Sequence, residues 1–121
     1  MQFMLLIYGD EKAMDAAERE KCYAQSTQLA HELHAHRRYV TAAPLHPTST
    51  ATTVRVRGGK RVVTDGPFAE THEQLGGFFL VEAEDLEEAI DIAERLPMAR
   101  FGTIEVRPVI QLPDLPVVSR V

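Results

Sequence analysis

Residues 14–36 contain neither proline nor glycine, and this uninterrupted stretch constrains the fold more than any other feature of the chain. Small or apolar residues recur within it at spacings of three and four, which predicts a long amphipathic α-helix. Charged residues occupy the opposite positions, so we expect the helix to bury one side only. The expected buried side consists of Cys22, Ser26, Leu29, Ala30 and Leu33.

Segments with strand patterns flank this helix. Residues 1–8 are apolar at nearly every position, as in the central strand of a sheet, and residues 38–43 predict a short edge strand. Residues 50–57 and 60–64 alternate β-branched and polar side chains around Gly58-Gly59, which is a two-residue hairpin signal. Gly76-Gly77 indicates close backbone approach at the start of the next strand, and the remaining predicted strands cover residues 78–83 and 103–109.

A second helix is predicted after Asp85, which is expected to cap it in a capping-box-like pair with Glu88. Pro97 marks the end of this helix. The expected buried stripe consists of Leu86, Ala89, Ile90, Ala93 and Leu96.

The order of these elements follows the split β-α-β plan of ferredoxin-like domains with an added strand, which is an α+β fold. Two helices then cover one face of the sheet. The first strand carries apolar side chains on both faces of the sheet, with Phe3 or Met4 and Leu5 or Leu6 on either face. The face without helices is therefore also expected to be covered by another surface. A homodimer that packs sheet against sheet would supply it.

Composition restricts the class of protein. A chain of 121 residues has the size of one domain, and its net charge of −5 argues against a nucleic-acid partner. Four basic residues gather on the hairpin, at Arg55, Arg57, Lys60 and Arg61, and are interpreted as a solvated face.

Cys22 is the only cysteine, so an intramolecular disulfide and a cysteine-based metal site are excluded. The apolar start of the chain ends at Gly9-Asp10-Glu11 and is too short for a signal peptide or a membrane span. We therefore expect a cytoplasmic protein with no membrane partner.

The turn Asp65-Gly66-Pro67 gives the strongest functional signal. Glycine before proline keeps the backbone out of the helical region, and proline fixes its own φ near about −65°, so the Asp65 side chain is held in place. A held, partly desolvated carboxylate is suited to general acid or base catalysis. The alternative is an Asx-type turn, in which the carboxylate accepts backbone N–H bonds.

Four further residues are candidates to assist Asp65, and each also has a structural alternative. His72 follows seven residues later and could form a proton-transfer pair with it, or be a solvated loop histidine. Glu70 could be a second carboxylate or a charge at a helix start. Tyr8 could turn its hydroxyl toward a cleft or cap the core, and Arg55 could bind an anionic ligand or pair with a cross-strand acid.

No metal or other cofactor is expected. His31 and His34 share a helix face at a spacing that could bind a metal, but no further ligand is visible in the sequence, and we interpret them as polar surface.

Five runs of residues carry a family resemblance: Met4-Leu5-Leu6-Ile7-Tyr8-Gly9-Asp10-Glu11, Ala51-Thr52-Thr53-Val54-Arg55, Thr64-Asp65-Gly66-Pro67-Phe68-Ala69-Glu70-Thr71, Glu73-Gln74-Leu75-Gly76-Gly77-Phe78 and Ile104-Glu105-Val106-Arg107-Pro108. Together they resemble the YCII-related family, in the branch named for its Asp-Gly-Pro-Phe motif. The resemblance extends from residue 1 to residue 109, which defines the predicted domain, and leaves a proline-containing tail over residues 110–121. Val117 and Val118 in this tail are expected to lie on another surface, such as a second subunit, and the alternative is a frayed terminus.

The resemblance implies a dimeric α+β barrel of ferredoxin-like subunits, mostly bacterial and cytoplasmic. Members of the wider family carry a His-Asp pair in a cleft, and one relative is a dehydrochlorinase that acts on a chlorinated hydroxyquinol. Ser26 occupies the position that aligns with the family's histidine, and His72 stands where the branch usually has lysine. Ser26 is therefore a candidate binding residue rather than half of the pair.

Two functions remain as hypotheses. The first is a cofactor-independent enzyme of lyase, isomerase or dehydrohalogenase type, in which Asp65 moves a proton on a small anionic or aromatic molecule near the dimer interface. The second is a non-catalytic regulatory dimer that binds a ligand or a protein, with the Asp65 turn as a structural clamp.

Overall fold

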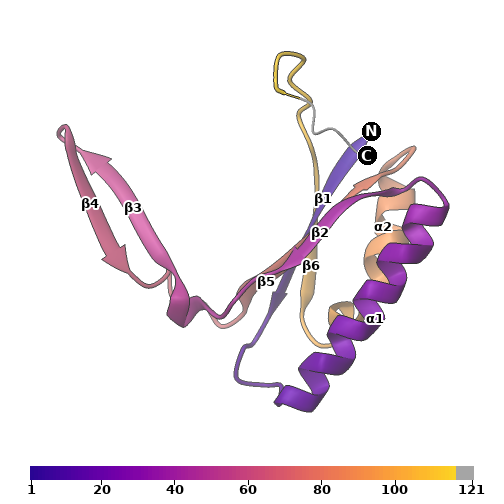
Figure 1. The fold of residues 1–121 in the computed structure, drawn as a ribbon, viewed down its shortest axis with the longest axis horizontal. Helices are drawn as coiled ribbons and strands as arrows, with labels where there is room; N and C mark the ends of the chain where they lie inside the picture. The colour runs from indigo at the N-terminus through magenta and orange to yellow at the C-terminus, as the bar shows by residue number, and fades with distance from the viewer. Residues whose placement is uncertain (117–121) are drawn as a thin grey trace.

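The computed structural model describes residues 1–116 as an antiparallel sheet with helices on one face and a separate hairpin on the other side (Figure 1). Val117 and Val118, on which part of the expectation for the tail rests, lie outside the described residues. The elements in chain order are β1 (Gln2–Gly9), α1 (Ala16–Ala35), β2 (Tyr39–Pro44), the 3-10 turn η1 (Thr48–Thr50), β3 (Thr52–Arg57), β4 (Lys60–Asp65), β5 (Gln74–Glu82), α2 (Leu86–Glu94), the 3-10 turn η2 (Pro97–Ala99) and β6 (Thr103–Pro108).

The main sheet has the strand order β2-β5-β1-β6, and every neighbouring pair is antiparallel. β1 is central and β2 is an edge strand, as the sequence patterns predict. This order confirms the α+β ferredoxin-like fold. The additional strands do not extend the sheet: β3 and β4 pair only with each other and form a two-stranded sheet of their own.

Side chains of β1 and β5 alternate between the two faces of the sheet, and those on the helix side form one wall of the core. Phe3 and Leu5 of β1 lie opposite Val81 and Phe79 of β5, and all four side chains are buried. α1 adds Leu29 and Leu33 from the face that its periodicity predicts, and α2 adds its own buried residues to the same core. Burial of such side chains contributes roughly 1.5–3 kcal/mol each and is the main source of stability.

α1 begins one residue after Asp15, whose side chain accepts the Glu18 N–H at 2.8 Å. The Glu18 carboxylate in turn accepts the Asp15 N–H at 3.3 Å, which completes a capping box. Cys22 is buried on the inner side of the helix, as expected, and Ser26 is partly buried.

α2 confirms the expected cap, because the Asp85 carboxylate accepts the Glu88 N–H at 2.9 Å. The predicted stripe is partly wrong. Leu86 and Ile90 are exposed, and Ile92 is buried in their place. The inner side of this short helix is centred on small residues that approach the core closely, so Leu86 and Ile90 fall at its margins; the buried residues are Ala89, Ile92 and Ala93.

β5 begins at Gln74, four residues earlier than the sequence pattern predicts, and Gly76-Gly77 lies within the strand. The expected close approach is found at Gly77, where an added Cβ would lie 2.9 Å from the carbonyl oxygen of Ala43. Any larger residue would separate β5 from β2 at this point.

The face of the main sheet without helices is largely apolar. Its central residues are Met4 and Leu6 of β1 and their partners Leu80 and Phe78 of β5, each only partly buried. We refer to these four residues as the open sheet face. The β3–β4 hairpin projects on the same side of the sheet, away from the helices (Figure 1).

Candidate functional site

The Asp65 turn is fixed to the base of the hairpin from two directions. Gly66 adopts a φ of 105°, which favours glycine, and its N–H donates to the Ala51 carbonyl at 2.7 Å. The Gly66 carbonyl accepts the Thr53 hydroxyl at 2.7 Å. Asp65 itself pairs with Thr52 as the last residue of β4. The backbone that carries the carboxylate is therefore rigid.

The Asp65 carboxylate is exposed, and within residues 1–116 no hydrogen bond or ion pair engages it. An Asx-type turn, in which this carboxylate would accept a nearby N–H, is therefore not formed by the described residues. The group is held by its backbone and remains available to a ligand.

A cavity of about 220 Å³ adjoins the turn. Its walls come from η1 and from the loop that returns from the hairpin to β5. Glu70 is among its lining residues, and Asp65 stands directly before the first lining residue of that loop. The lining residues are Thr48, Ser49, Gly66, Pro67, Ala69, Glu70, Thr71 and Gln74.

Glu11 connects this cavity to the main sheet. Its carboxylate accepts the Thr48 N–H at 2.8 Å and the Thr48 hydroxyl at 2.9 Å, and its own N–H donates to Gln74 Oε1 at 2.9 Å. Gln74 Nε2 then donates to the carbonyls of Thr71 at 2.6 Å and His72 at 3.3 Å. One carboxylate and one amide thus hold both walls of the cavity at the ends of β1 and β5.

Sequence reasoning assigned no chemistry to Glu11, Thr48 or Gln74. Glu11 and Gln74 occur within the runs that carry the family resemblance, yet their partners are separated from them by long stretches of chain. The available signal was an acidic residue two positions after a strand end, which is common in loops and therefore weak.

The predicted site residues fall into separate groups. Glu70 and His72 lie with Asp65 in one segment of chain, and His72 is exposed. Tyr8 lies at the end of β1, beside Leu75 and Thr103, and its register places it on the side of the open sheet face. These residues all belong to the end of the sheet where the hairpin is rooted.

Arg55 and Ser26 lie apart from this group. Arg55 pairs with Val62, and because side chains alternate along a strand, it points to the opposite face of the hairpin from Asp65. Ser26 lies on α1, which covers the side of the sheet away from the hairpin (Figure 1). Neither joins Asp65 within a single copy of the chain.

Phe68, in the Asp-Gly-Pro-Phe motif, is 80% exposed, so it takes no part in the core of a single copy. Phe79 is buried in the core, and Phe78 belongs to the open sheet face. The motif therefore exposes both a carboxylate and an aromatic ring at the surface.

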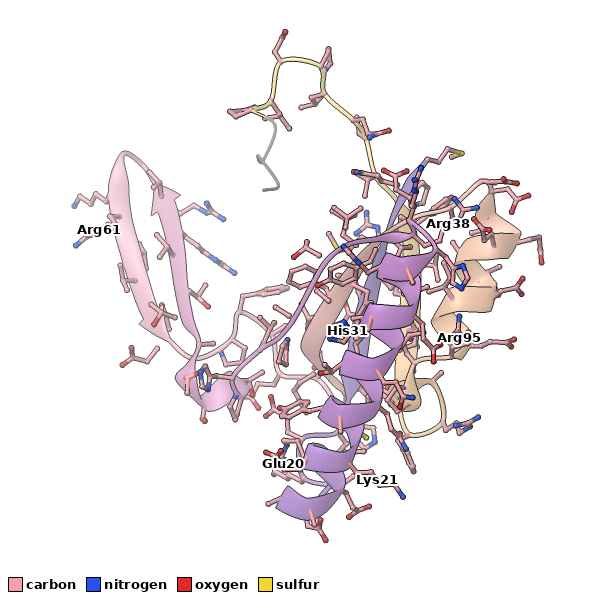
Figure 2. All side chains as sticks on the ribbon, turned by 45° about the vertical axis from the view of Figure 1, so that its right-hand side comes forward. Glu20, Lys21, His31, Arg38, Arg61 and Arg95 are labelled. Carbon is pink, nitrogen blue, oxygen red and sulfur yellow. The ribbon has the colours of Figure 1, made fainter. Side chains whose placement is uncertain are left out.

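Two other features of the sequence, the histidines of α1 and the basic residues of the hairpin, lie at the surface. In residues 1–116, no three His, Cys, Asp or Glu side chains are grouped to hold a metal ion, and His31 is exposed on α1 (Figure 2). Arg61 stands on the hairpin strand farthest from the main sheet (Figure 2). No helix in the described part of the chain is long and apolar enough to cross a membrane.

A larger groove of about 1080 Å³ lies at the other end of the main sheet, bordered by Gln2, Glu82, Tyr39 and the segment after β6. Ile110, Leu112 and Leu115 of that segment are exposed. Gln2 Nε2 donates to Glu82 at 3.0 Å across its floor. This groove lies away from Asp65, since Gln2 and Gly9 are at opposite ends of β1.

The fold and the site together define a small ferredoxin-like α+β protein with a rigid acidic turn at the root of a projecting hairpin. The YCII-related domain matches residues 1–113, so the chain belongs to the YCII-related family, as the sequence resemblance predicts. The chain is also 40% identical over 117 residues to an uncharacterised protein of Rhizobium meliloti (strain 1021), with 89% of this chain and 91% of the relative covered.

Among solved structures, the fold is similar to that of 5-chloro-2-hydroxyhydroquinone dehydrochlorinase (TftG) from Burkholderia phenoliruptrix AC1100, in complex with 2,5-dihydroxybenzoquinone. The TM-score is 0.55 at 18% sequence identity, over 91% of this chain and 94% of that chain. At this identity the similarity establishes the fold.

Proposed function

We propose that this protein is a homodimeric enzyme that transfers a proton on a small aromatic or anionic molecule, with Asp65 as the general acid or base. The observation that carries the proposal is the Asp65 carboxylate itself. It stands on a turn that is fixed through Gly66, it has no hydrogen-bond partner in residues 1–116, and the next residues of the turn, Gly66 and Pro67, line a cavity. A structural aspartate at such a turn would ordinarily bond to backbone N–H groups.

Glu70 and His72 are the groups best placed to assist. Glu70 lines the cavity, and His72 belongs to the same loop. A histidine changes charge close to physiological pH, so it can return the proton that a carboxylate takes up. Tyr8 would orient a ligand from the end of β1. Arg55 and Ser26 could take part only from a second copy, because each points away from Asp65 in its own chain.

The size of the cavity favours a small ligand. At about 220 Å³ it falls below the roughly 300–1,000 Å³ of sites for drug-sized molecules and suits a single ring. The structurally similar dehydrochlorinase indicates one candidate chemistry, the loss of HCl from a chlorinated hydroxyquinol. That reaction requires an acceptor for a proton while chloride leaves with its bonding electrons, and a carboxylate can be the acceptor.

The open sheet face supports the proposed homodimer. Met4, Leu6, Phe78 and Leu80 form a contiguous apolar surface, and no helix of the described residues lies over it. In a dimer with a two-fold axis, each copy can cover the open sheet face of the other, and such dimers are the commonest soluble homo-oligomers.

The test measures ligand binding and turnover in wild type and Asp65→Asn. We expect 2,5-dihydroxybenzoquinone to raise the melting temperature of wild type, and chloride release from 5-chloro-2-hydroxyhydroquinone to fall by about 10²–10⁴-fold in Asp65→Asn. Asp91→Asn, at an exposed aspartate on α2, is the matched control and should behave as wild type.

Stability separates this proposal from a structural role of the turn. Asp65→Asn should leave the melting temperature without ligand within a few degrees of wild type, because the carboxylate has no partner to lose. A large drop in melting temperature, with turnover or ligand binding intact, would instead indicate the clamp of a non-catalytic binding dimer.

A further inference from the structure

The β3–β4 hairpin lies apart from the remainder of its own chain. No helix or strand of the described residues packs extensively against it, and in Figure 1 it extends away from the main sheet. A two-stranded hairpin of this length is at best marginally stable in water when nothing packs on it. The hairpin therefore requires a surface that a single copy does not provide.

One face of the hairpin has valine at three of its six positions. The register pairs Val54 with Val63, and Val56 lies on the same side as both. These side chains are 61%, 51% and 63% exposed, respectively. We call these three residues the valine face; Arg61, opposite Val56, borders it near the tip. The other side carries Arg55, Arg57 and Lys60 and is suited to solvent.

The register places the Asp65 side chain on the same side of the hairpin as the valine face. Thr52 and Asp65 form the pair at the root of the hairpin, two residues along each strand from Val54 and Val63. Because alternate residues of a strand share a side, the Asp65 carboxylate leaves the hairpin in the same direction as the valines. Whatever covers the valine face also approaches the candidate catalytic group.

The distribution of charge favours another copy of this chain as the partner. Of thirteen basic and eighteen acidic residues, the hairpin holds four and one, which leaves nine and seventeen for the remainder. A positive arm and a strongly negative body of the same chain attract each other between copies. The open sheet face provides the matching apolar surface, with Glu82, Glu105 and Arg107 around it by register.

From the isolated hairpin, its valine face and this charge division, we propose that the hairpin of each subunit packs its valine face on the open sheet face of the partner. This inference rests on the homodimer proposed above and adds that the Asp65 site is completed by the partner's sheet. Contact with the partner excludes water from the Asp65 carboxylate, which a single copy leaves exposed, and so places it in the partly desolvated setting that proton transfer needs.

Two neighbouring residues of β4 test the proposal. Val63→Lys puts a charge into the valine face, whereas Val62→Lys makes the same change at a residue that is 45% exposed on the opposite face. In sedimentation equilibrium, Val63→Lys should weaken the dimer by about tenfold or more, because an unpaired charge is costly in an apolar contact. Val62→Lys should leave the dimer unchanged.

The outcomes separate the two proposals. A wild-type dimer that is weakened equally by both variants, or by neither, overturns the hairpin contact and leaves the homodimer standing. A wild-type chain that remains monomeric at all concentrations overturns both. Loss of Asp65-dependent turnover in Val63→Lys, with turnover retained in Val62→Lys, is expected if the site is completed by the partner.

Cross-linking provides a measurement that does not depend on weakening the dimer. Val63→Cys and Phe78→Cys are made in separate chains, which are mixed and treated with a short bis-maleimide. Native Cys22 is buried and should react little. We expect a cross-linked peptide that joins residues 63 and 78 of different chains, and none when Val62→Cys replaces Val63→Cys. Equal yields from both positions, or none from either, would overturn the contact.

Discussion

The main sheet and the hairpin differ in how their strands are stabilised. In the main sheet, β1 and β5 bury Phe3, Leu5, Phe79 and Val81 against helices of the same chain. In the hairpin, every residue of β4 is exposed, although β3 and β4 form a complete ladder. Hydrogen bonding between strands is thus satisfied in both regions, and burial distinguishes them.

This difference bears on where the candidate site lies. Asp65, the last residue of β4, lies at the junction of the two regions. The Glu11 carboxylate connects the neighbouring η1 turn to the end of β1 through two hydrogen bonds. The sheet gives the site a rigid foundation, and the hairpin carries the surface that we propose contacts a second copy. Under that proposal, the site depends both on the fold of one subunit and on assembly.

The largest expected effect contrasts core packing with the hairpin. Leu5 is 0% exposed, so Leu5→Ala should lower the free energy of unfolding by about 2–5 kcal/mol at any protein concentration. Val63→Ala should have an effect that depends on protein concentration, because Val63 is buried only in the proposed dimer. Urea denaturation at two concentrations a hundredfold apart measures both. A concentration-independent loss in Val63→Ala would contradict the difference drawn between the two regions.

The order of elements could be predicted from sequence because its signals are local. The helical spacing from Cys22 to Leu33, the cap at Asp85 and the hairpin turn at Gly58-Gly59 each depend on residues close together in the chain, and the structure contains all three. The close approach at Gly77 was predicted for the same reason. The predicted buried stripe of α2 was partly wrong because a helix of nine residues can turn any of several faces toward the core, and packing against the sheet selects one of them.

The arrangement of the site could be predicted only in part. Asp65 was found because glycine and proline fix its backbone locally, whereas the Glu11–Thr48 contact joins residues 37 positions apart and leaves no local pattern. The separation of Arg55 from Asp65 was in principle available from sequence. A two-residue turn at Gly58-Gly59 pairs Arg55 with Val62, which places it on the face opposite Asp65.

An intermediate effect is expected at the connection between the two regions. Glu11→Ala removes the acceptor of two bonds to Thr48 and should lower the free energy of unfolding by roughly 1–3 kcal/mol, since hydrogen bonds to a charged group are stronger than neutral ones. Hydrogen exchange should become faster at the backbone N–H of Thr48.

Glu20→Ala is the control for Glu11→Ala, because Glu20 is exposed on α1 (Figure 2). If Glu11→Ala matched this control in both stability and exchange, the bonds from Glu11 would not connect the hairpin root to the sheet.

The smallest expected effect concerns Cys22, which is buried on the inner side of α1. Burial, with a further contribution from the nearby Glu18 carboxylate, raises the pKa of the Cys22 thiol above its ordinary value of 9.0, and Lys21 opposes this only in part. The folded thiol therefore holds its proton more tightly than the unfolded thiol does. Its small contribution to stability is fully present below pH 9.0 and is lost as the pH rises through the raised pKa.

Thiol labelling compares this buried position with the hairpin directly. At pH 8, Cys22 should react with a disulfide reagent at least about tenfold more slowly than the added thiol of Val62→Cys, because a buried, protonated thiol reacts only when the structure opens. Val62 is on the side of the hairpin away from the proposed contact, so its label should enter monomer and dimer alike. In Val63→Cys, by contrast, labelling should slow as protein concentration rises; a rate that does not change with concentration would show that the valine face stays in solvent.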